Sequence, residues 1–442
     1  MAGEWARVPL AELVDDIIDR RGVTPKKLGS HFTTSGYRVI SAKVVRGRRV
    51  DLSADDPRFV DEATYRKWMK TPLKVDDVIL TSEAPLGEPA YVASDQEWCL
   101  GQRLLGIRTR KDRLSGRFLY YALQSEAVRH ELLSRATGTT AQGIRQAELR
   151  QVVIPVPDLD EQHAIAHTLG TLDDKIELNR RMNETLEAMA RALFKSWFVD
   201  FEPVWAKAEG RDTGLPSRVE DLFPESVVTT ELGEIPTGWG ISAFSDTVDV
   251  LGGGTPKTSI PEYWNGDIPW FSVVDAPRDS DVWVMGTAKH VTQSGIENSA
   301  ARVLPTGTTI ISARGTVGRV ALTGVPMAMN QSCYGIRGRV GANGYFTYFA
   351  TRELAALLKQ HAHGSVFDTI TRDTLASVSV VSPPERLVLE FEELVAPILQ
   401  RIRVNLTANR VLAELRDSLL PKLISGEIRA RDAERLIGET SP

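Results

Sequence analysis

The sequence predicts an α+β protein with two similar mixed domains, separated by two long helices that pair as an antiparallel coiled coil. Three observations predict this fold. The chain repeats itself once at a very long period, each copy mixes short β-branched runs with amphipathic stretches, and each copy ends in a heptad-like apolar seam. We therefore expect a tandem repeat whose halves are related by an approximate twofold axis.

The two copies of the repeat are collinear, and their offset falls slightly along the chain, as expected from short loop deletions. An ungapped match over the whole second part of each copy is unlike a chance similarity. The matched pairs include Thr24/Thr255 and Ile79/Ile310 at an offset of 231, Gln102/Gln331 at 229, and Gly138/Gly364, Ile144/Ile370, Asn179/Asn405, Asn183/Asn409 and Leu193/Leu419 at 226.

Within each copy, β-branched runs bounded by Gly and Pro indicate strands, as at Arg38–Ile40 and Thr308–Ile311. Amphipathic stretches near 117–134 and 345–361 indicate helices packed against them. The expected segments are a first mixed domain over 1–155, a central helical spacer and linker over 156–230, a second mixed domain over 231–382, and a C-terminal helical spacer over 383–442.

Each helical spacer carries apolar residues spaced alternately by four and three, which is the spacing of a coiled-coil seam. Asp158 with Glu161, and Ser382 with Glu385, have the spacing of helix-capping pairs. Proline is expected to kink or shorten the second helix. The first seam runs through Ile165, Leu169, Leu172, Ile176, Asn179, Asn183, Leu186, Ala190, Leu193 and Trp197, and the second through Phe391, Val395, Ile398, Ile402, Asn405, Asn409, Leu412, Arg416, Leu419 and Leu423, with Pro397 and Pro421 inside it.

Two apolar seams in one chain can bury each other if the helices run antiparallel. In that arrangement Asn179 faces Asn409 and Asn183 faces Asn405, so polar layers would set the register. The alternative is that each helix packs on its own domain and its asparagines face solvent.

The composition is that of a globular protein, with 442 residues, 42% hydrophobic and 25% charged. The sequence has no apolar run of the roughly 18 residues that a membrane helix needs, and its N-terminus lacks the layout of a secretory signal. The only cysteines, Cys99 and Cys333, are too few for a disulfide framework. We expect a soluble cytoplasmic protein.

The net charge of -5 conceals a division along the chain. Residues 1–155 hold 25 Lys+Arg and 20 Asp+Glu, a net of +5, whereas 156–230 hold 8 and 15, a net of -7. Nine basic residues and no acidic one lie in 20–50, and six arginines and no acidic residue lie in 298–352. Such stretches suit contact with phosphate, although a solvated basic face would look the same.

These stretches supply most of the candidate DNA-binding residues, and Gln102 and Arg103 are candidates outside them. Two polar turns matched between the copies, 137–145 and 364–372, add to them, although ordinary turn chemistry would also explain their composition. The candidates in the first copy are Lys43, Arg46, Arg48, Arg49, Gln102, Arg103, Thr139 and Arg145, and those in the second are Arg314, Arg319, Gln331, Arg337, Arg339, Ser365 and Arg372.

The acidic first spacer is a candidate protein-binding surface. Phe194, Trp197 and Phe198 lie close together near its end, and aromatic residues are common anchors of protein interfaces. These three residues are therefore the candidate subunit interface. The simpler alternative is that they fill the junction with the neighbouring domain.

No catalytic motif is found in the sequence. The glycines at 252–254 lack the spacing of a nucleotide-binding loop, and Ser382–Glu385 has no aromatic fourth residue on which a flipped base could stack. His163 and His167 lie one helical turn apart, as metal ligands can, yet no third ligand accompanies them. We therefore expect a non-catalytic chain that binds no metal.

Several segments resemble the specificity subunits of Type I restriction-modification systems, over essentially the whole chain. The second helix departs from the family pattern, because Pro384-Glu385-Arg386 replaces the Asp-Glu-Gln that begins the first. The segments that carry the resemblance are Leu159–Gln162, Leu172–Asn179, Leu193–Phe201 and Leu415–Ile428.

The resemblance implies two target-recognition domains that read the two parts of a bipartite, asymmetric DNA site. It implies helices that act as a spacer and as the docking surface for two methyltransferase subunits, which a restriction (nuclease-translocase) subunit can join. It also implies that this chain holds no cofactor, and that S-adenosylmethionine, ATP and Mg belong to the partner subunits. A helix of about 38 residues is about 57 Å long, which limits the separation of the two readers.

Three alternatives remain open from the sequence. The chain could be the specificity subunit of another methyltransferase-dependent defence system with the same domain plan. It could be a free-standing nuclease or methyltransferase with a cryptic site, although no cofactor loop is present. It could also be a purely structural coiled-coil protein, but that interpretation does not explain the basic stretches.

Overall fold

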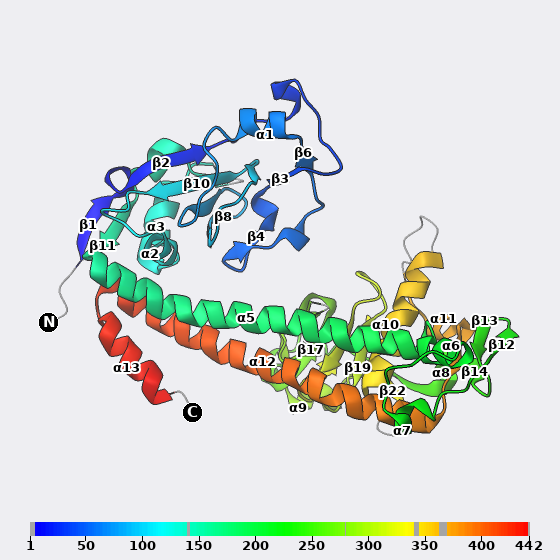
Figure 1. Cartoon of the computed structure of the whole chain (residues 1–442). Helices are drawn as coiled ribbons and strands as arrows, with labels where there is room; N and C mark the ends of the chain where they lie inside the picture. Colours follow the sequence, from blue (N-terminus) through cyan, green and yellow to red (C-terminus); the bar gives the residue numbers. More distant parts are fainter. Residues whose placement is uncertain (1–4, 139–141, 279, 340–343, 362–368, 441–442) are drawn as a thin grey trace. The chain divides into compact units, whose positions relative to one another are not determined.

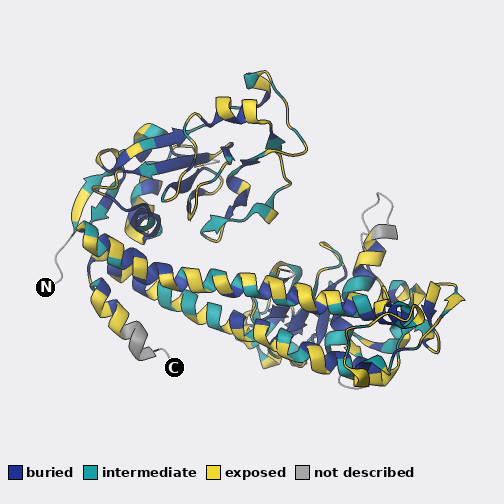
Figure 2. Ribbon diagram, viewed as in Figure 1, coloured by how far each residue is buried: buried dark blue, intermediate teal, exposed yellow. Residues whose placement is uncertain are grey.

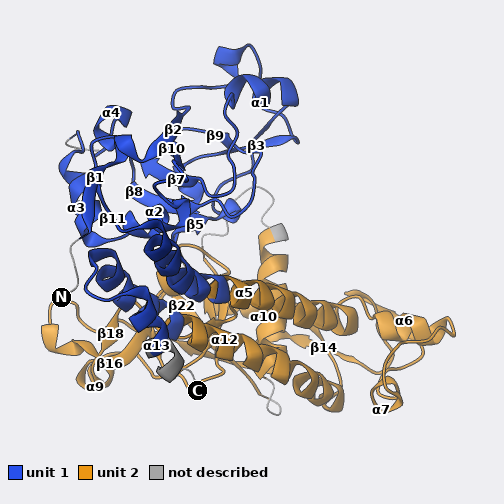
Figure 3. Ribbon diagram, turned by 60° about the vertical axis from the view of Figure 1, so that its left-hand side comes forward, with its two compact units in different colours: residues 1–175, 411–442 blue, residues 176–410 orange. Residues whose placement is uncertain are grey.

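The computed structural model describes residues 5–138, 142–278, 280–339, 344–361 and 369–440 (Figure 1). The chain forms two compact units. Unit 1 comprises Met1–Lys175 with Val411–Pro442, and unit 2 comprises Ile176–Arg410 (Figure 3). Both units mix helices and strands, so the predicted α+β class is confirmed.

Unit 1 is built on an antiparallel sheet whose strand order is β2-β10-β7-β8. A smaller sheet has the order β6-β3-β9, in which β3 and β9 are parallel. The strands are β1 (Ala6–Pro9), β2 (Val14–Asp19), β3 (Tyr37–Ile40), β4 (Val45–Arg46), β5 (Arg49–Val50), β6 (Phe59–Val60), β7 (Val78–Ser82), β8 (Leu86–Tyr91), β9 (Cys99–Leu100), β10 (Leu104–Thr109) and β11 (Val153–Val156), and the short helices are α1 (Glu62–Trp68), α2 (Gly116–Ala122), α3 (Glu126–Ser134) and α4 (Gln146–Leu149).

Unit 2 repeats this plan with the sheet β15-β22-β19-β20-β17 and the smaller sheet β18-β16-β21. Its strands are β12 (Val227–Thr230), β13 (Gly233–Pro236), β14 (Gly240–Ala243), β15 (Val248–Gly252), β16 (Trp264–Phe271), β17 (Trp283–Val284), β18 (His290–Val291), β19 (Thr309–Ser312), β20 (Val320–Thr323), β21 (Ala328–Met329), β22 (Cys333–Gly338) and β23 (Ser379–Ser382). Its shorter helices are α6 (Glu202–Ala208), α7 (Ser217–Glu220), α8 (Phe244–Thr247), α9 (Gln293–Glu297), α10 (Gly344–His361) and α11 (Arg372–Ser377).

Most strands of the two units correspond, although the main sheet of unit 2 has one more strand, β17. The pair β1–β11 matches β14–β23, and the parallel pair β3–β9 matches β16–β21. The hairpin β12–β13 and helix α7 have no counterpart among the described elements of unit 1. The internal repeat in the sequence is therefore a repeat of structure.

The two spacers form long helices, α5 (Leu159–Phe198) and α12 (Glu385–Ser425) (Figure 1). The Asp158 carboxylate accepts the Glu161 N–H at 2.9 Å, as the capping pair predicts. The Ser382 hydroxyl instead bonds to the hydroxyl of Ser242. Pro397 and Pro421 do not shorten α12, because both lie on its exposed side, where water can satisfy the carbonyl that each proline leaves unpaired.

The predicted antiparallel pairing of these helices is confirmed in the stretches that belong to unit 2. There the Asn179 Nδ2 donates to the Asn409 Oδ1 at 2.8 Å, and the Asn405 Nδ2 donates to the Asn183 Oδ1 at 2.8 Å. Asn179 on α5 pairs with Asn409 on α12, and Asn183 pairs with Asn405, so the two helices run antiparallel. The asparagines form two polar layers within the apolar seam, as the sequence predicts.

Each unit has its own apolar core, in which the inner faces of the long helices take part (Figure 2). In unit 1, the start of α5 and the end of α12 pack with α2 and the main sheet. Helix α13 (Ala430–Thr440) adds Ala430 and Ala433 to that core. In unit 2, the end of α5 and the start of α12 pack with α10 around a cluster of aromatic rings.

Candidate nucleic-acid interface

In unit 1, three turns meet at one end of the main sheet, and we call them the first turn cluster (82–86, 101–103 and 143–145). The Ile144 N–H donates to the Ser82 carbonyl at 2.9 Å, and the Ser82 N–H donates to the Arg103 carbonyl at 2.8 Å. These backbone bonds hold the three turns together. Turns fixed by a rigid sheet are the usual position for binding residues.

Unit 2 has a second turn cluster built in the same way (313–319, 330–332 and 369–372). The Ile370 N–H donates to the Ala313 carbonyl at 2.8 Å, and the Ala313 N–H donates to the Ser332 carbonyl at 2.7 Å. A backbone bridge joins Arg314 to Thr369, as another joins Glu83 to Gly143 in unit 1. The same turns therefore meet in both units.

The first turn cluster exposes Gln102, Arg103 and Arg145, three of the candidates. The Arg103 Nε donates to the Glu83 carboxylate at 3.0 Å, and its backbone has a left-handed φ of 66°. Arg21, which the sequence did not single out, donates to the Ile144 carbonyl at 3.0 Å and pairs with Asp19 at 2.6 Å. Burial raises the pKa of Asp19, but the hydrogen bonds from Arg21 outweigh it and hold that pKa below its ordinary value.

The second turn cluster exposes Arg314, Arg319, Gln331 and Arg372, which are also candidates. The Thr255 hydroxyl donates to the Gln331 side-chain oxygen, and Arg372 donates to the Val250 carbonyl at 3.2 Å. Gln331 is matched by Gln102 in the first cluster, whereas the surrounding cations differ. The candidates Thr139 and Ser365 lie outside the described residues.

The basic residues in the β4–β5 hairpin and just before it are not all free to contact phosphate. Arg46 is exposed, and no described residue is its hydrogen-bond or ion-pair partner. Lys43 is exposed but lies 3.4 Å from the Asp55 carboxylate, and Arg49 lies 3.9 Å from that of Asp51. Arg46 and Lys43 thus remain available at the surface of unit 1.

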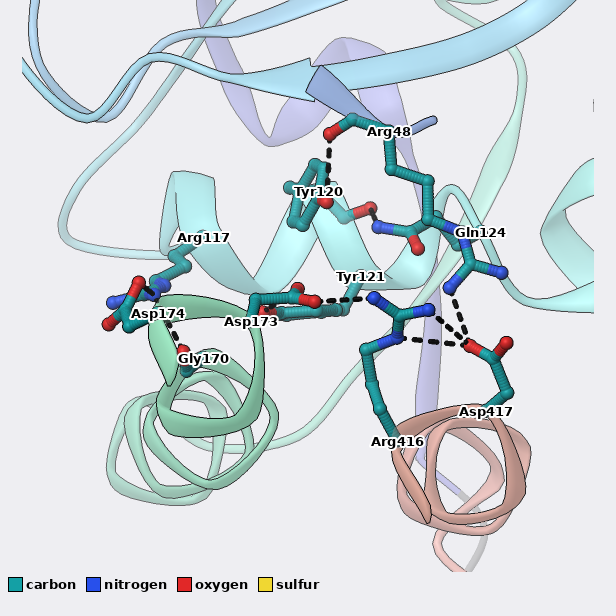
Figure 4. Close-up of polar contacts among 10 residues, drawn as sticks. All are labelled: Arg48, Arg117, Tyr120, Tyr121, Gln124, Gly170, Asp173, Asp174, Arg416 and Asp417. Atoms are coloured by element: carbon teal, nitrogen blue, oxygen red, sulfur yellow. Dashed lines mark hydrogen bonds and ion pairs between the residues drawn. The ribbon is translucent and has the colours of Figure 1, made fainter. Parts of the chain in front are cut away.

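Arg48, another predicted DNA-binding residue, already has an ion-pair partner in unit 1. Its Nη1 donates to the Asp417 carboxylate on α12 at 2.6 Å, and its carbonyl accepts the Tyr120 hydroxyl at 3.0 Å (Figure 4). Asp417 also pairs with Arg416 at 2.9 Å. Burial raises the pKa of Asp417, but Arg48 and Arg416 outweigh it and lower that pKa overall.

This contact belongs to a longer polar network in unit 1 (Figure 4). Arg416 donates to the Asp173 carboxylate at 2.5 Å, and the Tyr121 hydroxyl donates to the same carboxylate at 2.7 Å. Arg117 pairs with Asp174 at 2.6 Å. One signal for this network is present in the sequence, since Arg416 is a charged residue at a position of the apolar seam.

Arg337 and Arg339 are also separate from the second turn cluster. Arg337 is exposed toward the far end of β22, five residues after Ser332, or about 16 Å along a strand. Arg339 follows that strand, and its Nε donates to the Asp249 carboxylate at 3.0 Å. A DNA surface limited to the turn cluster would not include them.

The aromatic residues predicted as a subunit interface are instead in the core of unit 2, which favours the simpler alternative. Trp197 is 1% exposed and packs edge-on to Phe223 and Phe391 at centroid distances of 5.3 and 6.1 Å. Phe194 and Phe198 are also buried in this cluster. A charged replacement there would disrupt unit 2 before it tested partner binding.

No group of three or more His, Cys, Asp or Glu side chains in the described ranges is arranged to hold a metal. None of the helices in the described part of the chain has the length and apolar character that crossing a membrane requires.

The chain matches a family of known proteins over most of its length. The model of the Type I restriction modification DNA specificity domain matches residues 3–188 and 236–388. The chain is 27% identical over 397 residues to the specificity subunit of the type I restriction enzyme HindI from Haemophilus influenzae, covering 79% of this chain and 86% of that protein. It is 26% identical over 419 residues to the MjaIX specificity subunit from Methanocaldococcus jannaschii, covering 93% of this chain and 87% of that protein.

A crystal structure of the S subunit of a type I restriction-modification system from Mycoplasma genitalium has a similar fold. The TM-score is 0.56 at 17% sequence identity, and the match covers 95% of this chain and 96% of that one. At this identity the likeness concerns the fold alone.

Proposed function

Because the chain belongs to the family of type I restriction-modification DNA specificity subunits, we propose that it recognises a bipartite, asymmetric DNA target through its two turn clusters. The chain is a DNA sequence-specificity subunit. In this proposal the domain over 1–155 reads one half of the target and the domain over 231–382 reads the other.

The observation that carries the proposal is the duplicated turn cluster with unequal side chains. Gln102 and Gln331 are matched, and amide side chains can read adenine in the major groove. Around them, unit 1 presents Arg103 and Arg145, whereas unit 2 presents Arg314, Arg319 and Arg372. Two frameworks of the same shape with different side chains would read two different short sequences.

The partners in this proposal are double-stranded DNA, two methyltransferase subunits and the restriction subunits that join them. The chain itself would be non-catalytic and would bind no cofactor. S-adenosylmethionine, ATP and Mg would be used by the partner subunits, in the cytoplasm where the DNA lies. The purified chain, mixed with DNA and either S-adenosylmethionine or Mg, should neither methylate nor cleave the DNA. Either activity without partner subunits would contradict the proposal that the chain is non-catalytic.

DNA binding by the first turn cluster is tested by replacing Arg103 and Arg145 together with alanine. Because each arginine that neutralises a phosphate displaces counterions, the double variant should bind more weakly, and the salt slope of its affinity should fall by about two units. Arg66→Ala is the matched control, because Arg66 is an exposed arginine that pairs with Glu62 on α1. An unchanged slope in the double variant would remove this cluster from the interface.

The bipartite reading is tested by methylome sequencing of cells that hold the chain with its methyltransferase subunits. Replacing the arginines of one cluster should relax one half of the motif and leave the other half unchanged. Inserting about four residues, roughly one turn, into both long helices should lengthen the gap without altering either half. One continuous motif, or a gap indifferent to helix length, would contradict the proposal.

A further inference from the structure

Unit 2 contains an apolar groove with a volume of about 630 Å³ where the end of α5, the β12–β13 hairpin, α8, α10 and the start of α12 meet. The rings of Phe194, Phe198 and Phe346 contribute to its lining. The aromatic cluster is therefore a core that remains partly open on one side.

Large apolar side chains surround this groove and are exposed to water. Val199 is 39% exposed, Leu232 42%, Leu357 43% and Leu389 39%, and all four line the groove. Single exposed apolar residues are ordinary, but four around one groove mark a site that a partner covers.

The other copy of the repeat shows that the fold does not require these apolar residues. At the offset of 226, the counterparts of Val199, Leu357 and Leu389 in unit 1 are Ser425, Glu131 and His163. Unit 1 thus carries polar side chains where unit 2 carries exposed apolar ones, although the elements around them correspond. The apolar surface is a property of unit 2 alone.

The charges around the groove have one sign. The ionisable residues that line it are Asp246, Glu353 and Glu385, and no lysine or arginine lines it among the residues that the structure describes. A specific protein interface usually has an apolar centre and a polar rim. Charge complementarity therefore favours an occupant with an apolar face flanked by cations.

We propose that this groove binds the apolar face of a positively charged amphipathic helix from a methyltransferase subunit. The inference rests on the proposed function, which supplies that partner. Helices dock in grooves of this kind through apolar residues spaced by three and four positions. Since unit 1 lacks the apolar side chains, the two methyltransferase subunits attach to the chain unequally, and the copy on unit 2 is held more tightly.

The direct test is the triple variant Val199→Ser, Leu357→Glu and Leu389→His, which gives unit 2 the residues of unit 1. Because each replacement is exposed and tolerated by the same fold, the variant should keep its circular dichroism and its DNA affinity. Titration with the purified methyltransferase subunit, followed by native mass spectrometry, should show one tight and one weak site on the natural chain, and two weak sites on the variant. Val274→Glu, at a residue 82% exposed outside the groove, is the control and should keep the tight site.

The acidic rim is tested separately with Asp246→Asn, Glu353→Gln and Glu385→Gln in one chain. Removing the three charges should weaken methyltransferase binding about tenfold at low salt, and much less at high salt. Unchanged binding by both triple variants would overturn the inference. So would a natural chain that dimerises alone through the groove, detected as a concentration-dependent dimer that the apolar triple variant abolishes. A natural chain that binds no methyltransferase at all would instead overturn the proposed function.

Discussion

The two units join the long helices to the mixed domain by different chemistry at corresponding positions. In unit 1 the joint is the polar set Tyr121, Asp173 and Arg416 (Figure 4). In unit 2 the residues at these positions are Phe349, at an offset of 228, and Leu399 and Ala190, at an offset of 226, all of them buried.

This difference indicates that the fold constrains the shape of the contact between the long helices and the mixed domain more than its polarity. A polar joint depends on every partner being present, because a buried charge left unpaired is costly. An apolar joint depends on filled volume and tolerates small shifts. The two halves of one chain should therefore respond differently to the same kind of mutation.

The largest effect is expected from Phe391→Ala in unit 2. Phe391 is fully buried and contacts the rings of Phe194 and Phe198 at centroid distances of 5.7 and 5.3 Å. Its loss should lower the free energy of unfolding of unit 2 by about 4 kcal/mol, and Ile165→Ala at the matching position of unit 1 should cost about 3 kcal/mol. Calorimetry with hydrogen exchange would assign each loss to its unit, and a loss spread evenly over both units would contradict the comparison.

The next effect is expected from Asp173→Ala in unit 1, which leaves Arg416 and the Tyr121 hydroxyl without their shared partner. We expect a loss of about 3 kcal/mol. The triple replacement Tyr121→Phe, Asp173→Leu and Arg416→Ala introduces the apolar set of unit 2 and should recover stability to within about 1 kcal/mol of the natural chain. Urea unfolding measures both, and a triple variant no better than the single one would show that the polar set is required.

The stabilities of the two units should depend differently on pH, because different side chains accept a backbone N–H at the starts of α2 and α10. In unit 1 the neutral Gln162 accepts the Ser115 N–H at 2.9 Å, whereas in unit 2 Glu392 accepts the Phe346 N–H at 2.6 Å. Burial raises the pKa of Glu392 from 4.5 to about 7. The unfolded chain therefore releases this proton at lower pH, so the free energy of unfolding of unit 2 should fall between pH 4.5 and 7 and then level off.

Glu392→Gln should remove this dependence and stabilise unit 2 above pH 7 by up to roughly 3 kcal/mol. The gain should be absent below pH 4.5, where the carboxyl is protonated in both the folded and the unfolded natural chain. Thermal unfolding as a function of pH measures the effect. A variant that keeps the natural slope would assign the titration to another group.

The smallest effect is expected at the buried asparagine layer. Asn183 is fully buried, and its Nδ2 has no hydrogen-bond partner among the described residues. Replacing Asn183 and Asn405 together with leucine removes both polar partners, so stability should change little or rise by about 1 kcal/mol. Cysteine crosslinks placed along α5 and α12 should then report more than one register, and a single register would show that the asparagines do not specify it.

The sequence predicted those features that depend on neighbours along the chain. The seams of α5 and α12 follow from spacing, and their pairing follows from two seams in one chain. It did not predict that Trp197 is buried, because the rings that cover it come from Phe223 and Phe391. The same limit applies to Arg48, whose partner Asp417 is 369 residues away in the sequence. Composition reveals a basic run, but only the tertiary fold reveals which cations are already neutralised.

Unit 1 is assembled from two separate stretches of chain, whereas unit 2 is continuous. The core of unit 1 includes Leu419, Leu423 and Ala430, which the ribosome makes long after the rest of that core. Ribosomes add about 5 to 20 residues each second, and domains usually fold in the order of their synthesis. Here that order is reversed. Unit 2 can complete its core once residue 410 has been made, whereas unit 1 cannot complete its core until residues 411–442 have been made.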